Sequence, residues 1–462
     1  MPQSSNGLPA LFSELHAFLR RLGDLQKRGL MKRKITSYQE GLRYLYGLQK
    51  YGIKFGLSST SNLLKAFGNP HEGRSFVHIG GTNGKGSVAA FVASVLKHAG
   101  FKVGLYTSPH LVRFSERIRI NDREIPEEMS GALIGELQDV VNSREPPTFF
   151  EATTAMALVY FARERTDIDV IEVGMGGRLD ATNVILPSVA VITNISREHE
   201  AFLGSHLLDI ASEKAGIIKP GIDVVTGAAN PKIVELFERV SREKGASFWR
   251  LGRDVRYRYT ATGLHYHGWI QSLHRLALGL RGPFQGRNAA LALAAIERLV
   301  IKGMRVPAQS MREGLKSTVW PGRMHVLREN PTILLDGAHN PKAARTLAKG
   351  LRKGFRYKRL IVVLGVMKDK DIGGLVRAIV PVADYVVYSR PLYARAANPE
   401  ILMAKARLLG TPGEKIPRLT RALDRARELA RPEDMILVTG SLFTVGEAMA
   451  YLDPVAYRPD GL

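Results

Sequence analysis

From residue 38 to residue 300 the chain alternates short apolar runs with amphipathic stretches, the pattern of β-α-β units. Apolar runs at residues 76–79, 102–106, 170–173 and 189–195 predict strands. Each run has Gly, Ser, Asn or an acidic residue at or just beyond its end, where open parallel sheets place their ligands. The pattern therefore predicts a mainly parallel sheet with functional residues along its carboxyl edge.

A second α/β pattern follows a change of rhythm. Residues 220–283 contain β-like runs such as RDVRYRYTATGLHYHGW, which predict a side hairpin, and NAALALAAIERLV then predicts a helix. After WPGR at residues 320–323 the alternation restarts with TILLDGAHN, LIVVLGV, DYVVYS and DMILVTGSL. We therefore expect a separate C-terminal α/β domain, with a hinge near residues 305–325.

The first 30 residues stand apart from both patterns, with apolar positions at helical spacing and several basic residues nearby. We interpret them as an accessory helix, or as an upstream extension with Met31 as the natural start; a membrane-surface or partner helix is the other interpretation. No apolar core precedes a small-residue cleavage site, so a secretory signal is not expected. The apolar positions are Leu8, Leu11, Phe12, Leu15, Phe18, Leu22 and Leu25.

Composition limits the class of protein. The 462 residues exceed one ordinary core, and hydrophobic (45%) and charged (24%) residues are balanced as in a soluble globular protein. The chain has no cysteine, which excludes disulfides, thiolate metal sites and cysteine nucleophiles. No apolar run reaches the ~18 residues that a membrane helix needs, so we expect a cytoplasmic protein without membrane contact.

The formal net charge of +23 attracts anions, and nucleic acids, nucleotides and polycarboxylates all qualify. The sequence has no zinc-finger spacing and no RNP-like aromatic motif, so nucleic acid is the less favoured partner. A basic surface that only keeps the protein soluble explains the charge equally well.

The stretch FVHIGGTNGKGSVAAFVASVL reads as a strand, a glycine-rich turn and a helix. It departs from the common phosphate-binding loop, because three residues separate Gly80 from Gly84 and Gly86 stands between Lys85 and Ser87. Glycines let successive N–H groups point at an anion, and the helix N-terminus and Lys85 add positive charge. The pattern predicts a phosphate site, with a plain β-turn-α corner as the alternative.

GTNGKGS in this setting resembles the Mur-ligase superfamily, ATP-dependent enzymes that join amino acids to carboxylates. Cell-wall ligases of that superfamily carry a UDP-sugar-binding domain before the loop, and Lys85 comes too early for one. Together with further motifs along the chain, this loop resembles the folylpolyglutamate synthase and dihydrofolate synthase family. The resemblance extends from about residue 38 to residue 447. Those motifs are YLYGLQKYGIKFGL, YTSPHLVRFSERI, TFFEATTA, EVGMGGRLDATN, EKAGIIK, WPGRM, LDGAHNP and VTGSL.

The resemblance implies a P-loop-type ATPase domain with a mainly parallel sheet and a smaller C-terminal Rossmann-like α/β domain. We place the amphipathic extension at residues 1–34, the ATP-binding domain at 35–316 and the C-terminal domain at 317–462. In the implied reaction, the γ-phosphoryl group of ATP moves to a carboxylate, and the amine of L-glutamate attacks the acyl phosphate. Such an enzyme mainly positions reactants and stabilises charge.

The resemblance also assigns nucleotide and catalytic residues. Lys85 would hold the phosphates, Arg323 would couple nucleotide binding to domain closure, and His339 would help to place glutamate. Ser441 shares that last role, with a turn residue as the equal alternative. The implied ATP-binding residues are Asn83, Gly84, Lys85, Gly86, Ser87, Asn288, Arg323 and Asp336.

By the same resemblance, Ser108, Glu172 and His199 would hold Mg²⁺, with two ions expected. Glu172 ends a buried-looking strand, where a carboxylate needs a cation, and an arginine salt bridge is the alternative. His199 is less natural for magnesium, and chemistry alone makes it a surface or general-base histidine. Glu198 stands where the family more often has Asp.

Lys214 of EKAG is a catalytic residue by resemblance, because the family carboxylates this lysine to support a second metal ion. Carboxylation needs a neutral amine, which burial or cationic neighbours favour. Without the resemblance, an exposed Lys214 paired with Glu213 or Asp209 is the simpler interpretation.

Phe149 and Phe150 of TFFE would form an apolar wall for a pterin, although such a pair is more typical of a core. The full set of implied folate-binding residues is Thr148, Phe149, Phe150, Glu151, Leu179, Asp180 and Ala181.

We therefore expect a monomeric, bifunctional enzyme that uses ATP to add L-glutamate to dihydropteroate and to folate polyglutamates. The alternatives are a monofunctional folylpolyglutamate synthase, a ligase for another acid, and a basic nucleic-acid-binding ATPase. The expected partners are small-molecule substrates, without nucleic acid or membrane.

Overall fold

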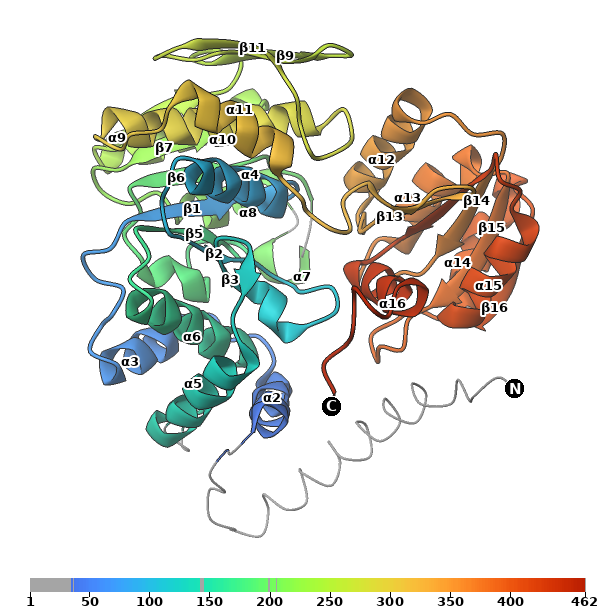
Figure 1. The fold of residues 1–462 in the computed structure, drawn as a ribbon, viewed down its shortest axis with the longest axis horizontal. Coiled ribbons are helices and arrows are strands. Elements are labelled where there is room, and N and C mark those ends of the chain that lie inside the picture. The colour runs from blue at the N-terminus through green and yellow to red at the C-terminus, as the bar shows by residue number, and fades with distance from the viewer. Residues whose placement is uncertain (1–34, 36, 142–144, 198–199, 205, 462) are drawn as a thin grey trace.

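The computed structural model describes residues 35, 37–141, 145–197, 200–204 and 206–461. The described chain forms two lobes, each a sheet covered by helices on both faces (Figure 1). The strand order is β4-β3-β2-β5-β1-β6-β7-β8 in the first sheet and β12-β13-β17-β14-β15-β16 in the second. The predicted fold class, a parallel-rich sheet followed by a second α/β sheet, is confirmed. The predicted helix within residues 8–25 lies outside the described residues.

Six strands of the first sheet are parallel, and two short antiparallel strands extend one edge. The prediction for residues 189–195 was too long, because β6 ends at Ile192 and the next residues bond to the loop after β1. The parallel strands are β1 (Phe76–Gly80), β2 (Val103–Tyr106), β5 (Ile168–Glu172), β6 (Val189–Ile192), β7 (Asp223–Thr226) and β8 (Ser247–Arg250). The antiparallel pair is β3 (Ile118–Ile120) and β4 (Arg123–Glu124).

Helices cover both faces of this sheet because its central parallel strands are buried on both sides. One face packs against α4 (Lys85–His98), α10 (Gln285–Ile301) and α11 (Ala308–Ser317). Around the other face lie α2 (Tyr38–Gly47), α3 (Ser58–Ala66), α5 (Glu127–Val140), α6 (Phe149–Arg163), α8 (Leu207–Ala215) and α9 (Pro231–Glu243). Shorter helical turns are η1 (Leu48–Tyr51), η2 (Phe114–Arg117), η3 (Ala181–Val184) and α7 (Glu200–Leu203).

The side hairpin predicted from RDVRYRYTATGLHYHGW is present, but residues 220–283 also contribute strands to the main sheet. β7 and β8 fall in that stretch but join the main sheet, because β7 is fully buried. The remainder forms an antiparallel sheet of three strands, β9 (Arg256–Thr260), β10 (Gly263–His267) and β11 (Ser272–Leu276), above α10 in Figure 1. The buried carboxylate of Glu297 joins α10 to this small sheet, because it accepts hydrogen bonds from the Tyr266 hydroxyl at 3.0 Å and from Trp269 N at 2.9 Å.

The second sheet is parallel except for its first strand, and the four strands predicted from apolar runs are present. Its strands are β12 (His325–Arg328), β13 (Thr332–Asp336), β14 (Leu360–Leu364), β15 (Tyr385–Arg390), β16 (Gly413–Arg418) and β17 (Met435–Thr439). Its helices are α12 (Pro341–Gly354), α13 (Ile372–Ile379), α14 (Pro399–Ala406), α15 (Leu419–Leu429) and α16 (Leu442–Leu452), with η4 (Val380–Val382) and η5 (Arg407–Leu409). The domain boundaries given above stay predictions.

The C-terminal tail returns to the first lobe, where Asp460 accepts from the Tyr38 hydroxyl at 3.0 Å and from Phe114 N at 2.8 Å. Among the described helices, none is long and apolar enough to cross a membrane.

Glu447 on α16 is a buried carboxyl whose Oε2 accepts from Leu392 N at 2.6 Å. Its Oε1 has no hydrogen-bond partner among the residues that the structure places. Burial raises the pKa of Glu447 to about 7. Because the folded-state pKa is raised, the stability that the protonated carboxyl contributes is present at low pH and lost as pH rises toward and through 7.

The variant Glu447→Gln cannot ionise and is expected to match the wild type at pH 4, below the ordinary carboxyl pKa, and to exceed its stability by about 3 kcal/mol at pH 8. Urea unfolding midpoints of both proteins at the two pH values measure this difference. Glu433→Gln is the control, because Glu433 is exposed and pairs with Lys358 at the surface. An equal difference between wild type and Glu447→Gln at both pH values would contradict the assignment.

Candidate functional site

The loop between β1 and α4 is built around glycines with positive φ angles. Gly81 has φ of +125° and Gly84 has φ of +90°, in the region that side chains disfavour. A Cβ on Gly81 would lie 2.0 Å from Thr193 Oγ1, and one on Gly84 would lie 2.7 Å from Asn288 Oδ1. Glycine is therefore required at both positions, and α4 begins at Lys85, directly after Gly84.

The segment after β6 fixes the shape of this loop. Thr82 N donates to Asn194 O at 2.8 Å, and Asn194 Nδ2 donates to Asn83 O at 2.6 Å. Thr193 Oγ1 donates to the same Asn83 oxygen at 2.9 Å. The sequence interpretation missed Thr193 and Asn194, although polar residues directly after an apolar run were the available signal.

Two lysines converge on one carbonyl of the loop. Lys85 Nζ and Lys214 Nζ each donate to Gly81 O at 3.1 Å. Lys214 lies on α8 with a relative exposure of 1%, and Glu213 pairs with Arg178 at 2.7 Å. The interpretation of Lys214 as an exposed lysine paired with Glu213 or Asp209 is therefore wrong, and its carboxylation stays a prediction.

Glu172 and Ser108 meet at the carboxyl edge of the first sheet. Glu172 is buried, and its Oε2 accepts from Ser108 N at 3.3 Å. Burial raises the pKa of Glu172, and the charge of Lys85, the Ser108 N–H and the charge of Arg323 oppose this rise. No arginine ion pair of Glu172 is formed within the described ranges, so the salt-bridge alternative is not supported there.

The third predicted metal ligand, His199, lies outside the described residues. Within the described part of the chain, no group of three His, Asp or Glu side chains is arranged to hold a metal ion. A single carboxylate beside a serine nonetheless fits magnesium, which takes oxygen ligands and keeps several waters.

The second lobe faces this site with Asp336 and Arg323. The buried Asp336 accepts from Met324 N and from Ala338 N, both at 2.9 Å. Burial raises its pKa, and the charge of Arg323 opposes the rise as it does for Glu172. The charge of Arg323 therefore acts on one carboxylate of each lobe, as expected for a residue near a hinge.

The ends of β13 and β17 carry the predicted glutamate-side residues. His339 Nδ1 is 2.9 Å from Gly337 O. Ser441 is the N-cap of α16, and its Oγ accepts from Thr444 N at 3.0 Å. These contacts agree with the alternative prediction that Ser441 is a structural turn residue. Asn340, which the sequence interpretation missed, donates from Nδ2 to Asn83 Oδ1 at 2.9 Å and joins the two lobes at the loop.

The start of α10 completes the surroundings of the loop. Asn288 Nδ2 donates to Gln285 Oε1 at 2.8 Å, and Gln285 Nε2 lies 3.4 Å from Ser87 Oγ. A Cβ on Gly86 would lie 2.9 Å from Trp320 Nε1, so that glycine also admits a close neighbour. The structure thus brings together the predicted ATP-binding residues of the first lobe.

The four residues of TFFE have structural contacts of their own. Thr148 and Glu151 form a capping box at the start of α6, with Thr148 N donating to Glu151 Oε2 at 2.7 Å and Glu151 N donating to Thr148 Oγ1 at 3.2 Å. Phe149 stacks on Tyr46 with ring centroids 5.5 Å apart. Phe150 is half-buried beside Gly174, where a Cβ would lie 2.4 Å from its ring. Their role as folate contacts stays a prediction.

Leu179, Asp180 and Ala181 lie in the loop after β5, beyond Glu172. Asp180 is buried and caps η3, and Ala181 is also buried, whereas Leu179 is partly exposed. This loop begins at the sheet edge that also carries Ser108 and Glu172. The predicted metal-binding and folate-binding residues therefore lie along the same edge of the sheet.

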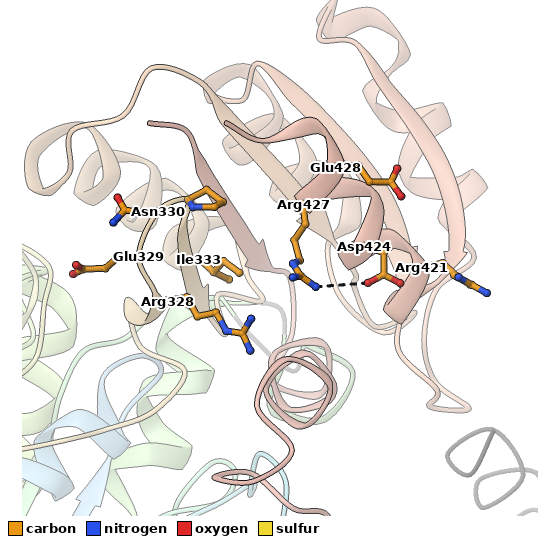
Figure 2. Close-up of a pocket in the computed structure, with 9 residues that line it drawn as sticks. Arg328, Glu329, Asn330, Ile333, Arg421, Asp424, Arg427 and Glu428 are labelled. Carbon is orange, nitrogen blue, oxygen red and sulfur yellow. Dashed lines mark ion pairs between the residues drawn. The ribbon is translucent and has the colours of Figure 1, made fainter. Parts of the chain in front are cut away.

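A groove of about 620 Å³ lies elsewhere, between the β12–β13 hairpin and α15 (Figure 2). Arg328 pairs with Ile333 at the start of β13, so the groove lies at the opposite edge from Asp336. None of the predicted site residues lines it. Its charged walls include the Arg427–Asp424 pair, at 4.0 Å.

Two family models match the chain: the Mur ligase middle domain at residues 79–296 and the Mur ligase glutamate ligase domain at residues 322–442. The dihydrofolate synthase/folylpolyglutamate synthase of Bacillus subtilis is 31% identical over 425 residues, which cover 89% of this chain and 98% of that protein. The chain belongs to this synthase family.

A longer relative of this chain is found in Haloferax volcanii. The probable bifunctional folylpolyglutamate synthase/dihydropteroate synthase of that organism is 38% identical over 429 residues. The match covers 89% of this chain and 50% of the relative. The chain therefore spans about half the length of that relative.

Solved structures of family members share the fold of this chain over most of its length. Escherichia coli FolC in complex with DHPP and ADP is 34% identical, with a TM-score of 0.84, and the match covers 92% of this chain and 99% of that chain. The Yersinia pestis bifunctional enzyme complexed with AMPPNP and a Mn ion is 30% identical, with a TM-score of 0.82 over 92% of this chain and all of that chain.

Proposed function

We propose that this synthase uses ATP to ligate L-glutamate to dihydropteroate and to folate polyglutamates through an acyl phosphate. One observation carries the proposal: the loop with Lys85 contacts the second lobe, where Asn340 Nδ2 donates to Asn83 Oδ1 at 2.9 Å, and the charge of Arg323 acts on Glu172 and on Asp336. A nucleotide held by the loop would place its γ-phosphate between the lobes, where an acceptor carboxylate and an amine can meet.

Ser108 and Glu172 would hold Mg²⁺, and His199 is the third proposed ligand. The ion supplies charge neutralisation on the phosphates when bound. The chain's own residues do the rest: the loop N–H groups and Lys85 bind phosphate oxygens, and Arg323 orients the nucleotide between the lobes. His339 and Ser441 would orient the incoming glutamate from the ends of β13 and β17.

Both acceptors are supported by the relatives. A family member with 34% identity binds DHPP and ADP, and the Bacillus relative carries both activities in its name. Leu179, Asp180 and Ala181, with Phe149 and Phe150, would form the acceptor side. The monofunctional synthase stays the alternative, and the cytoplasmic location, the monomeric state, the second metal ion and the lack of a nucleic-acid partner stay predictions.

Phosphate release from ATP tests the proposal. The full chain is incubated with Mg²⁺ and L-glutamate, and dihydropteroate or tetrahydrofolate is added in separate reactions, with product masses measured. Release with both acceptors, accompanied by glutamylated products, is the expected result. Release with tetrahydrofolate alone would reduce the function to the monofunctional synthase, and ATP turnover without glutamate would contradict ligation.

A further inference from the structure

His78 is a fully buried histidine in the middle of β1, two residues before the glycine that opens the phosphate loop. Burial and the nearby charge of Lys219 lower the pKa of His78 to about 3. The imidazole is therefore neutral at every pH at which the enzyme would work. Its side chain contacts the loop after β5, so phosphate binding does not account for it.

A hydrogen-bond relay connects His78 to Asp180 through one threonine. His78 Nε2 lies 2.8 Å from Thr182 Oγ1, and Thr182 Oγ1 donates to Asp180 Oδ1 at 2.5 Å. A hydroxyl has one proton, which here goes to the carboxylate, so the hydroxyl accepts from His78. The network thus assigns the proton of His78 to Nε2 and points the Thr182 hydroxyl at Asp180.

Asp180 in turn holds the whole loop after β5. Its Oδ1 also accepts from Thr182 N at 3.0 Å, and its Oδ2 accepts from Met175 N at 2.8 Å. The carboxylate therefore ties both ends of residues 175–182 together. Leu179 and Ala181, the proposed acceptor-side neighbours, are carried by this loop.

The other ring nitrogen of His78 indicates that stability is not why histidine stands here. Nδ1 is buried and has no hydrogen-bond partner among the described residues. A buried acceptor without a partner costs about 1–3 kcal/mol, which an apolar side chain of similar size avoids. Unmet polar groups of this kind are expected where a protein gives up stability for function.

We propose that His78 is a positioning residue for the acceptor substrate, acting through Thr182 on Asp180 to set the shape of the loop after β5. The inference rests on the proposed function and adds to it a determinant inside the core, on the strand that leads into the phosphate loop. Strand β1 thereby supports the binding of both substrates. The phosphate loop follows its end, and His78 in its middle supports the loop after β5, which carries the proposed acceptor-binding residues.

The test compares His78→Leu, His78→Gln and Thr182→Val in the full-length enzyme, with KM measured separately for dihydropteroate and ATP. Loss of the relay is expected to raise the KM for dihydropteroate about 5- to 10-fold in His78→Leu and Thr182→Val, since one buried hydrogen bond is lost. The KM for ATP and kcat should stay within about 2-fold of wild type. His78→Gln, whose amide can donate to Thr182, should recover most of the affinity.

Two further measurements separate positioning from a general loss of structure. The double variant His78→Leu/Thr182→Val should raise the KM no more than either single change, because both break the same relay. His325→Leu is the matched control, since His325 on β12 also has an Nδ1 without a partner but lies in the other lobe. It should leave both KM values unchanged.

If the wild type glutamylates dihydropteroate but the KM for dihydropteroate is unchanged in His78→Leu and Thr182→Val, the positioning role is overturned and the proposed function stands. Equal rises in both KM values, or additive effects in the double variant, also overturn it, because they indicate nonspecific disruption. If the wild type glutamylates no pteroate or folate, the proposed function fails and the inference fails with it.

Discussion

Replacement of Lys85 by alanine is expected to lower kcat/KM for ATP-dependent glutamylation by about 1,000-fold or more. Lys85 begins α4 and places its ammonium group inside the loop, 3.1 Å from Gly81 O. An ammonium group that contacts phosphate oxygens stabilises the charge that develops in transfer, and loss of such a group costs about 4 kcal/mol of transition-state stabilisation. Steady-state phosphate release with saturating glutamate measures the effect.

The matched control is Lys97→Ala. Lys97 lies in the last turn of the same helix, where it pairs with Asp122 at 2.6 Å in a partly exposed position. Its removal lowers the net charge of the protein by the same amount but leaves the loop intact, so activity should remain within about 2-fold of wild type. If the two variants lose activity equally, the charge acts at long range and the phosphate assignment of Lys85 is wrong.

Glu172→Gln is expected to have the second-largest effect, a loss of about 100-fold in kcat with a Mg²⁺ requirement shifted about 10-fold higher. Glutamine keeps the size of the side chain and can still accept the hydrogen bond from Ser108 N. It lacks the negative charge that Mg²⁺ needs and that balances Lys85 and Arg323. A magnesium titration of initial rates separates the metal effect from a loss of fold.

Glu164→Gln is the control for this change. Glu164 caps the end of α6 and pairs with Lys102 at 2.9 Å near the surface, away from the strand ends. Its magnesium titration should overlay that of the wild type. An unchanged magnesium titration for Glu172→Gln would remove Glu172 from the metal site and leave it as a buried carboxylate that only balances charge.

Most of the parallel strands of both sheets were predictable because they are buried apolar runs that end in small or polar residues. The edge strands β12 and β16 were not, since neither has such a run. β16 reads GEKIPR and is mostly exposed, so it pairs through its backbone without a hydrophobic pattern. The stretch after residue 220 was only partly predictable, because two strands of the main sheet, the buried β7 and the partly exposed β8, precede the hairpin strands in the same window.

The site was predictable where neighbours in sequence act together, as in the glycine loop and Lys85. It was not predictable where distant segments meet, because Asn340 reaches Asn83 across 257 positions and Lys214 reaches the loop across 133. The TFFE motif shows that residues assigned to a site by resemblance can also have a purely structural role. Its T-x-x-E spacing is that of a capping box, so Thr148 and Glu151 had a structural explanation available from the sequence.

The hydrogen bond from Asn340 to Asn83 ties the phosphate loop to α12 of the second lobe, and Lys342 adds a contact to Ile195 O at 3.4 Å. A rearrangement of the loop around phosphates is therefore coupled to the position of that lobe. By thermodynamic reciprocity, nucleotide binding and the separation of the lobes influence each other by the same free energy. An inhibitor wedged between the lobes would loosen the nucleotide without occupying any phosphate-binding atom.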